Sequence, residues 1–207
     1  MRRRTGDKER WITAAAMKIF AREGFHGAKI TSIAKEAGVA TGSVYLYFAN
    51  KEGLLQHIFS ELWQAMHASF QDLLLRKELT EKERIEHLID SIFDLFADRP
   101  ALALLFVNEQ PYLLREAPGE MMYHYVDFLR MGEQVVRSGI GKGEFSPDMH
   151  PRVFTNFVFG GIRQLLQQWA RAPRQFPLYV IRTEIKRIVM QGLLPRAVLN
   201  PAGNVRA

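Results

Sequence analysis

Four hydroxyl side chains lie within seven residues of one another near the start of the chain: Thr41, Ser43, Tyr45 and Tyr47. Hydroxyl groups donate and accept hydrogen bonds, and Gly42 between them lets a helix backbone approach another surface closely. Such a short helix is suited to the major groove of DNA, where hydroxyls bond to base edges and phosphates. The alternative is an ordinary helical corner. Two exposed tyrosines beside a basic segment favour a binding surface over that alternative.

Two short helices must position these hydroxyl groups. Apolar residues at helical spacing predict a helix over 30–37, and Gly38 provides the backbone freedom to end it. A third helix is predicted over 42–48, with Val44 and Phe48 on its inner face. Two short helices joined by a glycine-containing turn indicate a helix-turn-helix.

The positive charge is concentrated in this part of the chain. Residues 1–53 contain ten Lys or Arg and five Asp or Glu, a net charge of +5, whereas residues 54–207 contain eighteen and seventeen, a net charge of +1. A basic module on a near-neutral body is expected to bind a polyanion. The alternative of a sequence-indifferent DNA-packaging protein fits less well, because such proteins spread positive charge over most of their surface.

The composition also limits which other functions the protein can have. The chain has no cysteine, which suits a reducing cytoplasm, and no apolar run long enough to cross a membrane. A signal peptide is not expected after Arg2 to Arg4, because the charged residues from Asp7 to Arg10 interrupt the apolar stretch that it would need. Single Glu-x-x-x-His pairs at 83/87 and 120/124 are common on solvated helices, so a helical metal enzyme is a weak alternative. We predict a cytoplasmic protein without catalytic site, metal or cofactor.

The rest of the sequence predicts further helices. We therefore expect an all-α protein of about nine helices. Asn50 is a suitable N-cap for a helix to about residue 75, and Thr80 to Glu83 form a capping box. Later helices are predicted from Pro100 to before Pro111, over 116–138, over 151–172 and after Pro177, with the glycines of 139–143 in a loop. We place the domains at 1–53 and 54–207.

The last two predicted helices carry apolar stripes at three-four spacing. A single helix-turn-helix contacts one half-site, so specific binding usually needs a dimer. The stripes predict a four-helix dimer interface, although the core of the subunit itself is the alternative. The predicted interface residues are Phe154, Val158, Ile162, Leu165, Ile181, Ile185 and Ile188.

Residues 8–55 resemble the TetR family without a gap. The similar segments are AAAMKIFAREGF at 14–25, IAKEAG at 33–38, GVATGSVYLYF at 38–48 and NKEGLL at 50–55. The resemblance implies a homodimeric repressor that binds a palindromic double-stranded operator and is released by a small effector. It implies DNA contacts at Thr31, Thr41, Gly42, Ser43, Tyr45, Tyr47 and Lys51, with Lys51 on a phosphate. The sequence departs from the family at Lys29, where relatives often have a Ser or Thr cap.

The same resemblance implies an effector pocket among the middle helices, which are rich in aromatic residues. The predicted lining residues are Phe70, Leu74, Phe93, Phe96, Phe106, Tyr125, Phe128 and Phe157. These side chains predict a small hydrophobic ligand. A smaller set of residues, including FGGI at 159–162 before Trp169, is similar to the fatty-acid-degradation repressors of the family. That likeness implies long-chain acyl-CoA as one effector class, with Arg99, Arg130, Arg137 and Arg163 as candidates for its phosphates.

Overall fold

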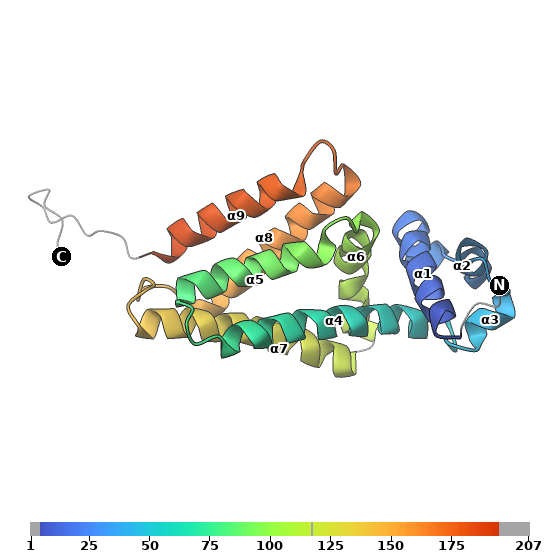
Figure 1. Cartoon of the computed structure of the whole chain (residues 1–207), viewed down its shortest axis with the longest axis horizontal. Helices are drawn as coiled ribbons and strands as arrows, with labels where there is room; N and C mark the ends of the chain where they lie inside the picture. The colour runs from blue at the N-terminus through green and yellow to red at the C-terminus, as the bar shows by residue number, and fades with distance from the viewer. Residues whose placement is uncertain (1–4, 117, 195–207) are drawn as a thin grey trace, which may run out of the picture.

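The computed structural model describes residues 5–116 and 118–194, and this part of the chain folds into nine helices with no strand. The prediction of an all-α fold is confirmed. The helices are α1 Thr5–Gly27, α2 Ile30–Ala37, α3 Thr41–Tyr45, α4 Lys51–Leu75, α5 Glu81–Phe96, α6 Pro100–Glu116, α7 Pro118–Gly141, α8 Pro151–Arg171 and α9 Leu178–Leu193. Figure 1 shows α1 to α3 grouped at one end of an elongated body. None of the described helices is long and apolar enough to cross a membrane.

The first three helices form a small head. Ile12, Ile19, Phe20 and Ile33 are buried against one another between α1 and α2. Gly38 ends α2 with φ 66, the left-handed conformation that favours glycine, and its N–H bonds to carbonyls of the last turn. The predicted helix over 30–37 is therefore confirmed. The third helix is shorter than predicted, because the chain turns at Leu46 and Tyr47.

Helix α4 joins the head to the body. The Asn50 side chain accepts a hydrogen bond from the Gly53 N–H at 2.7 Å, as expected of an N-cap. Leu54 and Ile58 are buried near the head, whereas Phe70 lies near the other end in the body core. One uninterrupted helix of 25 residues thus runs through the predicted domain boundary after residue 53.

Helix α6 continues through Pro111, which corrects the prediction that it ends before that residue. Proline has no N–H, so the Val107 carbonyl four residues earlier loses its usual donor within the helix. The Arg163 guanidinium of α8 donates to this carbonyl at 3.0 Å. A side chain that lies 56 positions away in sequence therefore supplies a donor that no local pattern could indicate.

Helix α7 runs on to Gly141, so the predicted glycine loop begins later than expected. Gly139 is a packing residue inside the helix. A Cβ atom built there would lie 2.1 Å from the Phe145 ring, which is itself buried. The chain turns back only at Gly143, where φ is 74. The glycine at 139 therefore permits close packing of the returning chain on α7.

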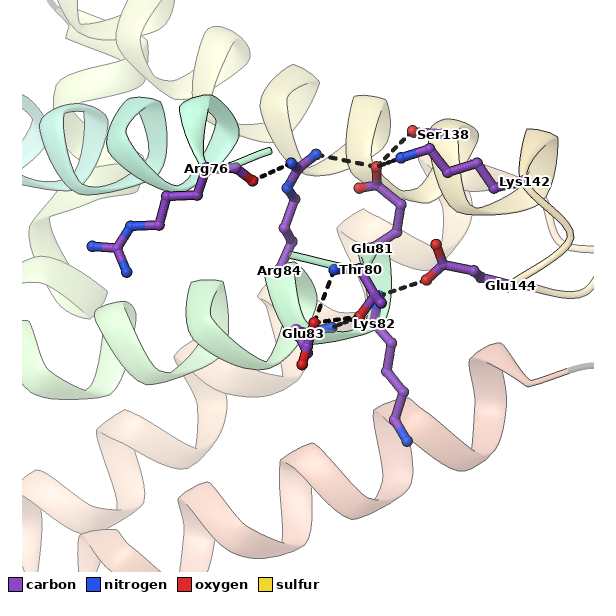
Figure 2. Close-up of polar contacts among 9 residues, drawn as sticks. All are labelled: Arg76, Thr80, Glu81, Lys82, Glu83, Arg84, Ser138, Lys142 and Glu144. Atoms are coloured by element: carbon purple, nitrogen blue, oxygen red, sulfur yellow. Dashed lines mark hydrogen bonds and ion pairs between the residues drawn. The ribbon is translucent and has the colours of Figure 1, made fainter. Parts of the chain in front are cut away.

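The far ends of α4, α5 and α7 meet at a buried carboxylate, shown in Figure 2. Glu81, in the first turn of α5, is 1% exposed. One of its oxygens accepts hydrogen bonds from Lys142 at 2.6 Å, Ser138 at 2.8 Å and Arg84 at 3.1 Å. Arg84 also donates to the Arg76 carbonyl, just after α4. We call Arg76, Glu81, Arg84, Ser138 and Lys142 the Glu81 cluster.

The cluster holds Glu81 in its ionised form. Burial alone raises the pKa of Glu81, but the bonds from Lys142 and Ser138 and the charges of Arg84 and Lys142 outweigh it, so the pKa lies below the ordinary value of 4.5. A group with a lowered folded-state pKa stabilises the protein above its unfolded pKa. This stabilisation is lost as the pH falls through the folded-state pKa.

We predict that Glu81→Gln lowers the free energy of unfolding at pH 7 by about 2–3 kcal/mol, because the buried guanidinium of Arg84 loses its counter-charge. Urea denaturation measures this difference. The difference in free energy of unfolding between the wild type and the variant should become smaller as the pH falls below 4.5. The exposed Glu78→Gln is the control and should have little effect. A gap that stays constant down to acid pH would contradict the role of the charge.

Candidate functional site

The residues predicted to contact DNA lie on α2, on and just after α3, and at the start of α4. Val44 and Phe48 point inward, 0% and 6% exposed, as the sequence predicts. Gly42 is exposed and has open space where a side chain would lie, and Thr31 is exposed on α2. Lys29 precedes α2 without a side-chain cap, as its departure from the family pattern predicts. The structure therefore presents one face of α2 and α3 to solvent.

The two tyrosines differ in exposure. Tyr45 is 54% exposed, whereas Tyr47 is half-buried against the head core. The expectation of two equally exposed tyrosines is therefore corrected. Thr41 and Ser43 are also half-buried. Leu46 is 83% exposed and was not singled out from the sequence, although an exposed apolar side chain in the major groove can contact the methyl group of thymine.

Lys51 has a structural role that the sequence did not reveal. Its ammonium donates to the carbonyls of His26 at 3.1 Å and Ala28 at 3.2 Å, and it lies 4.7 Å from the centre of the Phe25 ring. These contacts tie the start of α4 to the end of α1. An ammonium group has three N–H donors, so a third remains for a phosphate at the same helix N-terminus.

A second connection between head and body runs through α6. The Phe25 N–H donates to the Glu109 carboxylate at 3.3 Å, and the rings of Phe25 and Tyr112 lie 5.2 Å apart. Tyr112 also contacts His26 edge to face, at 5.1 Å. The end of α1 is therefore held by α6 as well as by α4. A displacement of either helix would move the head.

The body contains an apolar cavity between α5, α7 and α8, with an empty volume of about 470 Å³ that includes its mouth. Most of this volume is open to solvent, and the free interior is about 60 Å³. Its lining is Phe70, Ile85, Leu88, Ile89, Ile92, Phe128, Gly132, Val136, Phe154, Thr155, Val158, Phe159, Ile162 and Val189. Thr155 contributes the only side-chain hydroxyl to this set. An occupant must therefore present a largely hydrocarbon surface.

Two of the eight predicted pocket residues, Phe70 and Phe128, line this cavity. Phe96, Phe106 and Tyr125 belong to an adjoining aromatic cluster, in which Phe106 lies 5.3 Å from Phe96 and 6.4 Å from Phe159. Phe93 and Leu74 pack elsewhere in the body core. The prediction fails for Phe157, which is 76% exposed on the outer face of α8. Helical spacing marks an apolar face but does not tell which neighbour covers it.

Part of the predicted dimer interface is wrong for the same reason. Phe154, Val158 and Ile162 line the cavity of the subunit itself. Ile162 and Ile181 are only 1% and 2% exposed, so neither is available to a partner. The other three predicted residues are more accessible. Leu165 and Ile185 are half-buried and Ile188 is 51% exposed.

The outer face of α8 carries a different stripe, Val153, Phe157, Gly160 and Gly161. Val153 and Phe157 are 63% and 76% exposed. A Cβ atom built at either glycine would meet nothing within 4 Å. The glycine pair therefore does not serve close packing among the described helices, and the space beside it is open.

No metal centre emerges within residues 5–116 and 118–194, where no three His, Asp or Glu side chains converge on one point. Glu83, from one of the two Glu-x-x-x-His pairs, is engaged in the capping box, since it accepts hydrogen bonds from the Thr80 N–H and hydroxyl. The predicted capping box is thereby confirmed. The side chain of Glu120, from the other pair, lies outside the described residues.

Most of the chain is similar to known regulatory proteins. The chain is 28% identical over 186 residues to the fatty acid metabolism regulator protein of Bacillus subtilis strain 168, covering 88% of this chain and 93% of that protein. The fatty acid degradation regulator FadR of Bacillus halodurans is 25% identical, with a TM-score of 0.72 over 94% of this chain and 100% of the other. FadR of Bacillus subtilis in complex with stearoyl-CoA is also 25% identical, with a TM-score of 0.70 over 89% and 98% of the two chains.

Two family descriptions match the chain itself. Residues 12–58, which include the head, match the bacterial regulatory proteins of the tetR family. Residues 66–192, which include the cavity, match the C-terminal region of YsiA-like proteins. With its helix-turn-helix and its helical ligand-binding domain, the chain belongs to the TetR family of transcriptional regulators.

Proposed function

We propose that this regulator is a homodimeric repressor that binds a palindromic operator and is released by a long-chain acyl-CoA. The observation that carries the effector class is the apolar cavity of α5, α7 and α8, lined by hydrocarbon and aromatic side chains. A relative of similar fold has been solved with stearoyl-CoA, a ligand whose acyl chain has the matching chemistry. The apolar lining also suits a flexible hydrocarbon chain better than a large polar molecule.

The cavity is connected to the head by elements that touch both. Phe70 of α4 lines the cavity, and the first turn of α4 holds α1 through Lys51. Arg163 follows the cavity residue Ile162 on α8 and bonds to α6, whose Glu109 holds the Phe25 N–H. Ligand binding that shifts α4 or α6 would therefore change the separation of two heads in a dimer. Such a change favours release from an operator of fixed half-site spacing.

The proposed dimer uses the outer stripe of α8 together with accessible residues of α9. Phe157 is an unusually large apolar side chain to leave in water, and Ile188 of α9 is half exposed. Gly160 and Gly161 allow a partner helix to approach closely. Two helices from each subunit would then pair about a two-fold axis, which matches the symmetry of a palindromic operator.

We predict that stearoyl-CoA stabilises the protein and weakens operator binding. At a free concentration 100 times the dissociation constant, the stabilisation is about 2.7 kcal/mol, which raises the melting temperature by roughly 5–10 °C. Thermal denaturation and fluorescence anisotropy on an operator selected from random DNA measure the two effects. Coenzyme A without an acyl chain is the control. The absence of both effects across a panel of acyl chain lengths would refute this effector class.

We predict that Lys51→Met reduces the salt dependence of operator binding. Each lost phosphate contact lowers the slope of log K against log salt by about 0.9, so a dimer should lose roughly 1.8. Lys77→Met, in the turn after α4 and far from the head, is the matched control. Weaker binding with an unchanged slope would mean that Lys51 acts only through its bonds to His26 and Ala28.

We predict that Phe157→Glu separates the subunits, because charges would face each other across the proposed interface. Sedimentation equilibrium should change from twice the mass of one chain to the mass of one chain, with the helical circular dichroism preserved. Val126→Glu is the control, since Val126 is an exposed apolar residue on α7, 52% exposed. A variant that remains dimeric would place the interface elsewhere.

A further inference from the structure

Besides the Thr155 hydroxyl of the cavity lining, three side chains of α4, α6 and α8 have buried polar atoms without a hydrogen-bond partner among the described residues. The unpaired atoms are the amide nitrogen and oxygen of the Gln110 side chain, the Nε of Arg163 and the indole Nε1 of Trp63. Gln110 and Trp63 are each 0% exposed. Buried polar groups are nearly always paired in folded proteins, because leaving them unpaired is costly. Polar atoms in this position indicate that another molecule supplies their partners.

Two phenylalanines connect the helices that carry these three side chains. Gln110 lies one helical turn after Phe106 on α6, and Arg163 lies one turn after Phe159 on α8. The rings of Phe106 and Phe159 are 6.4 Å apart, and the Trp63 ring lies 5.9 Å from that of Phe106. The three side chains therefore belong to turns that adjoin one aromatic cluster of α4, α6 and α8.

Arg163 is the charged member of this group. It has no carboxylate within ion-pair distance in the described part of the chain, and its one hydrogen bond there goes to the Val107 carbonyl. Burial lowers the pKa of its guanidinium, which the neighbouring Tyr125 partly opposes. An arginine nevertheless stays protonated in proteins and has five donors. A half-buried cation with unused donors attracts a carbonyl or carboxylate oxygen.

Cavity residues and Arg163 follow one another along α8. Phe154, Val158, Phe159 and Ile162 line the cavity, and Arg163 is the next residue. From Phe154 to Arg163 the helix rises about 13 Å. The site therefore has a long apolar part and a short polar end. This division matches an amphiphile better than a uniformly apolar molecule.

We propose that Arg163, Gln110 and Trp63 bind the acyl carbonyl oxygen of a long-chain acyl ligand whose hydrocarbon tail fills the cavity. This inference rests on the proposed function and identifies the part of the effector that the protein reads. The oxygen competes with the Val107 carbonyl for Arg163. Carbonyl binding thereby loosens the contact between α8 and α6, the helix that holds α1 through Glu109.

Isothermal titration calorimetry with two matched ligands tests the subsite. Stearoyl-CoA has the carbonyl oxygen, and S-octadecyl-CoA, a thioether, lacks it. The wild-type protein should bind stearoyl-CoA about tenfold or more tightly than the thioether, as expected for a hydrogen bond to a charged group. In Arg163→Gln this preference should fall to within about threefold. Arg152→Gln, at an exposed arginine in the first turn of α8, is the control and should keep the full preference.

Gln110→Met gives an independent readout. Removing unpaired buried amide atoms should raise the melting temperature of the free protein by roughly 2–4 °C while weakening stearoyl-CoA binding. A purely structural Gln110 would give a lower melting temperature instead. Stearate, tested in parallel, shows whether a carboxylate serves as well as a thioester.

The possible results distinguish failure of the carbonyl subsite from failure of the acyl effector class. If the wild type binds both coenzyme A ligands equally, or if Arg163→Gln keeps the wild-type preference, the subsite assignment is overturned and the acyl effector stands. If the wild type binds none of the three ligands, the acyl effector class fails and the subsite fails with it. Operator binding, measured separately, tests the regulator itself in either case.

Discussion

The rigidity of α4 is the constraint on which the rest of the structure depends. Its backbone hydrogen bonds run unbroken from Lys51 to Leu75, so the helix resists bending and moves as one piece. Its first turns are packed into the head, and Phe70 near its other end lines the cavity. Close-packed interiors transmit small displacements because they have little free space to absorb them. A change of volume around Phe70 therefore has to be passed along the helix or relieved at its ends.

Both ends of α4 are fixed by polar contacts of different kinds. At the far end, the Glu81 cluster ties the residue after the helix to α5 and α7. At the near end, the Lys51 ammonium donates to the carbonyls of His26 in α1 and of Ala28 just after it. Glu81 is buried at the far end, and Lys51 is half-buried at the near end. A second link to the head runs through α6 and Glu109.

Local signals in the sequence predicted much of the fold. The Asn50 cap, the capping box at Thr80 and the end of α2 at Gly38 all depend on residues a few positions apart, and the structure confirms them. The inward face of α3 was predicted for the same reason. Features that depend on distant residues were missed, such as the passage of α6 through Pro111 and the exposure of Phe157. Apolar periodicity showed which helix faces are covered. It could not separate cavity, core and partner, because all three use the same side chains.

The close approach of Phe145 to Gly139 also bears on how this sequence can change. The ring occupies the space that any β-carbon at position 139 would need. Alanine at 139 therefore becomes tolerable only after a smaller side chain has appeared at 145, and a ring at 145 persists only while 139 stays glycine. Substitutions at positions 139 and 145 are therefore tolerated only when both change together. In divergent descendants of this chain, their identities should be inherited together.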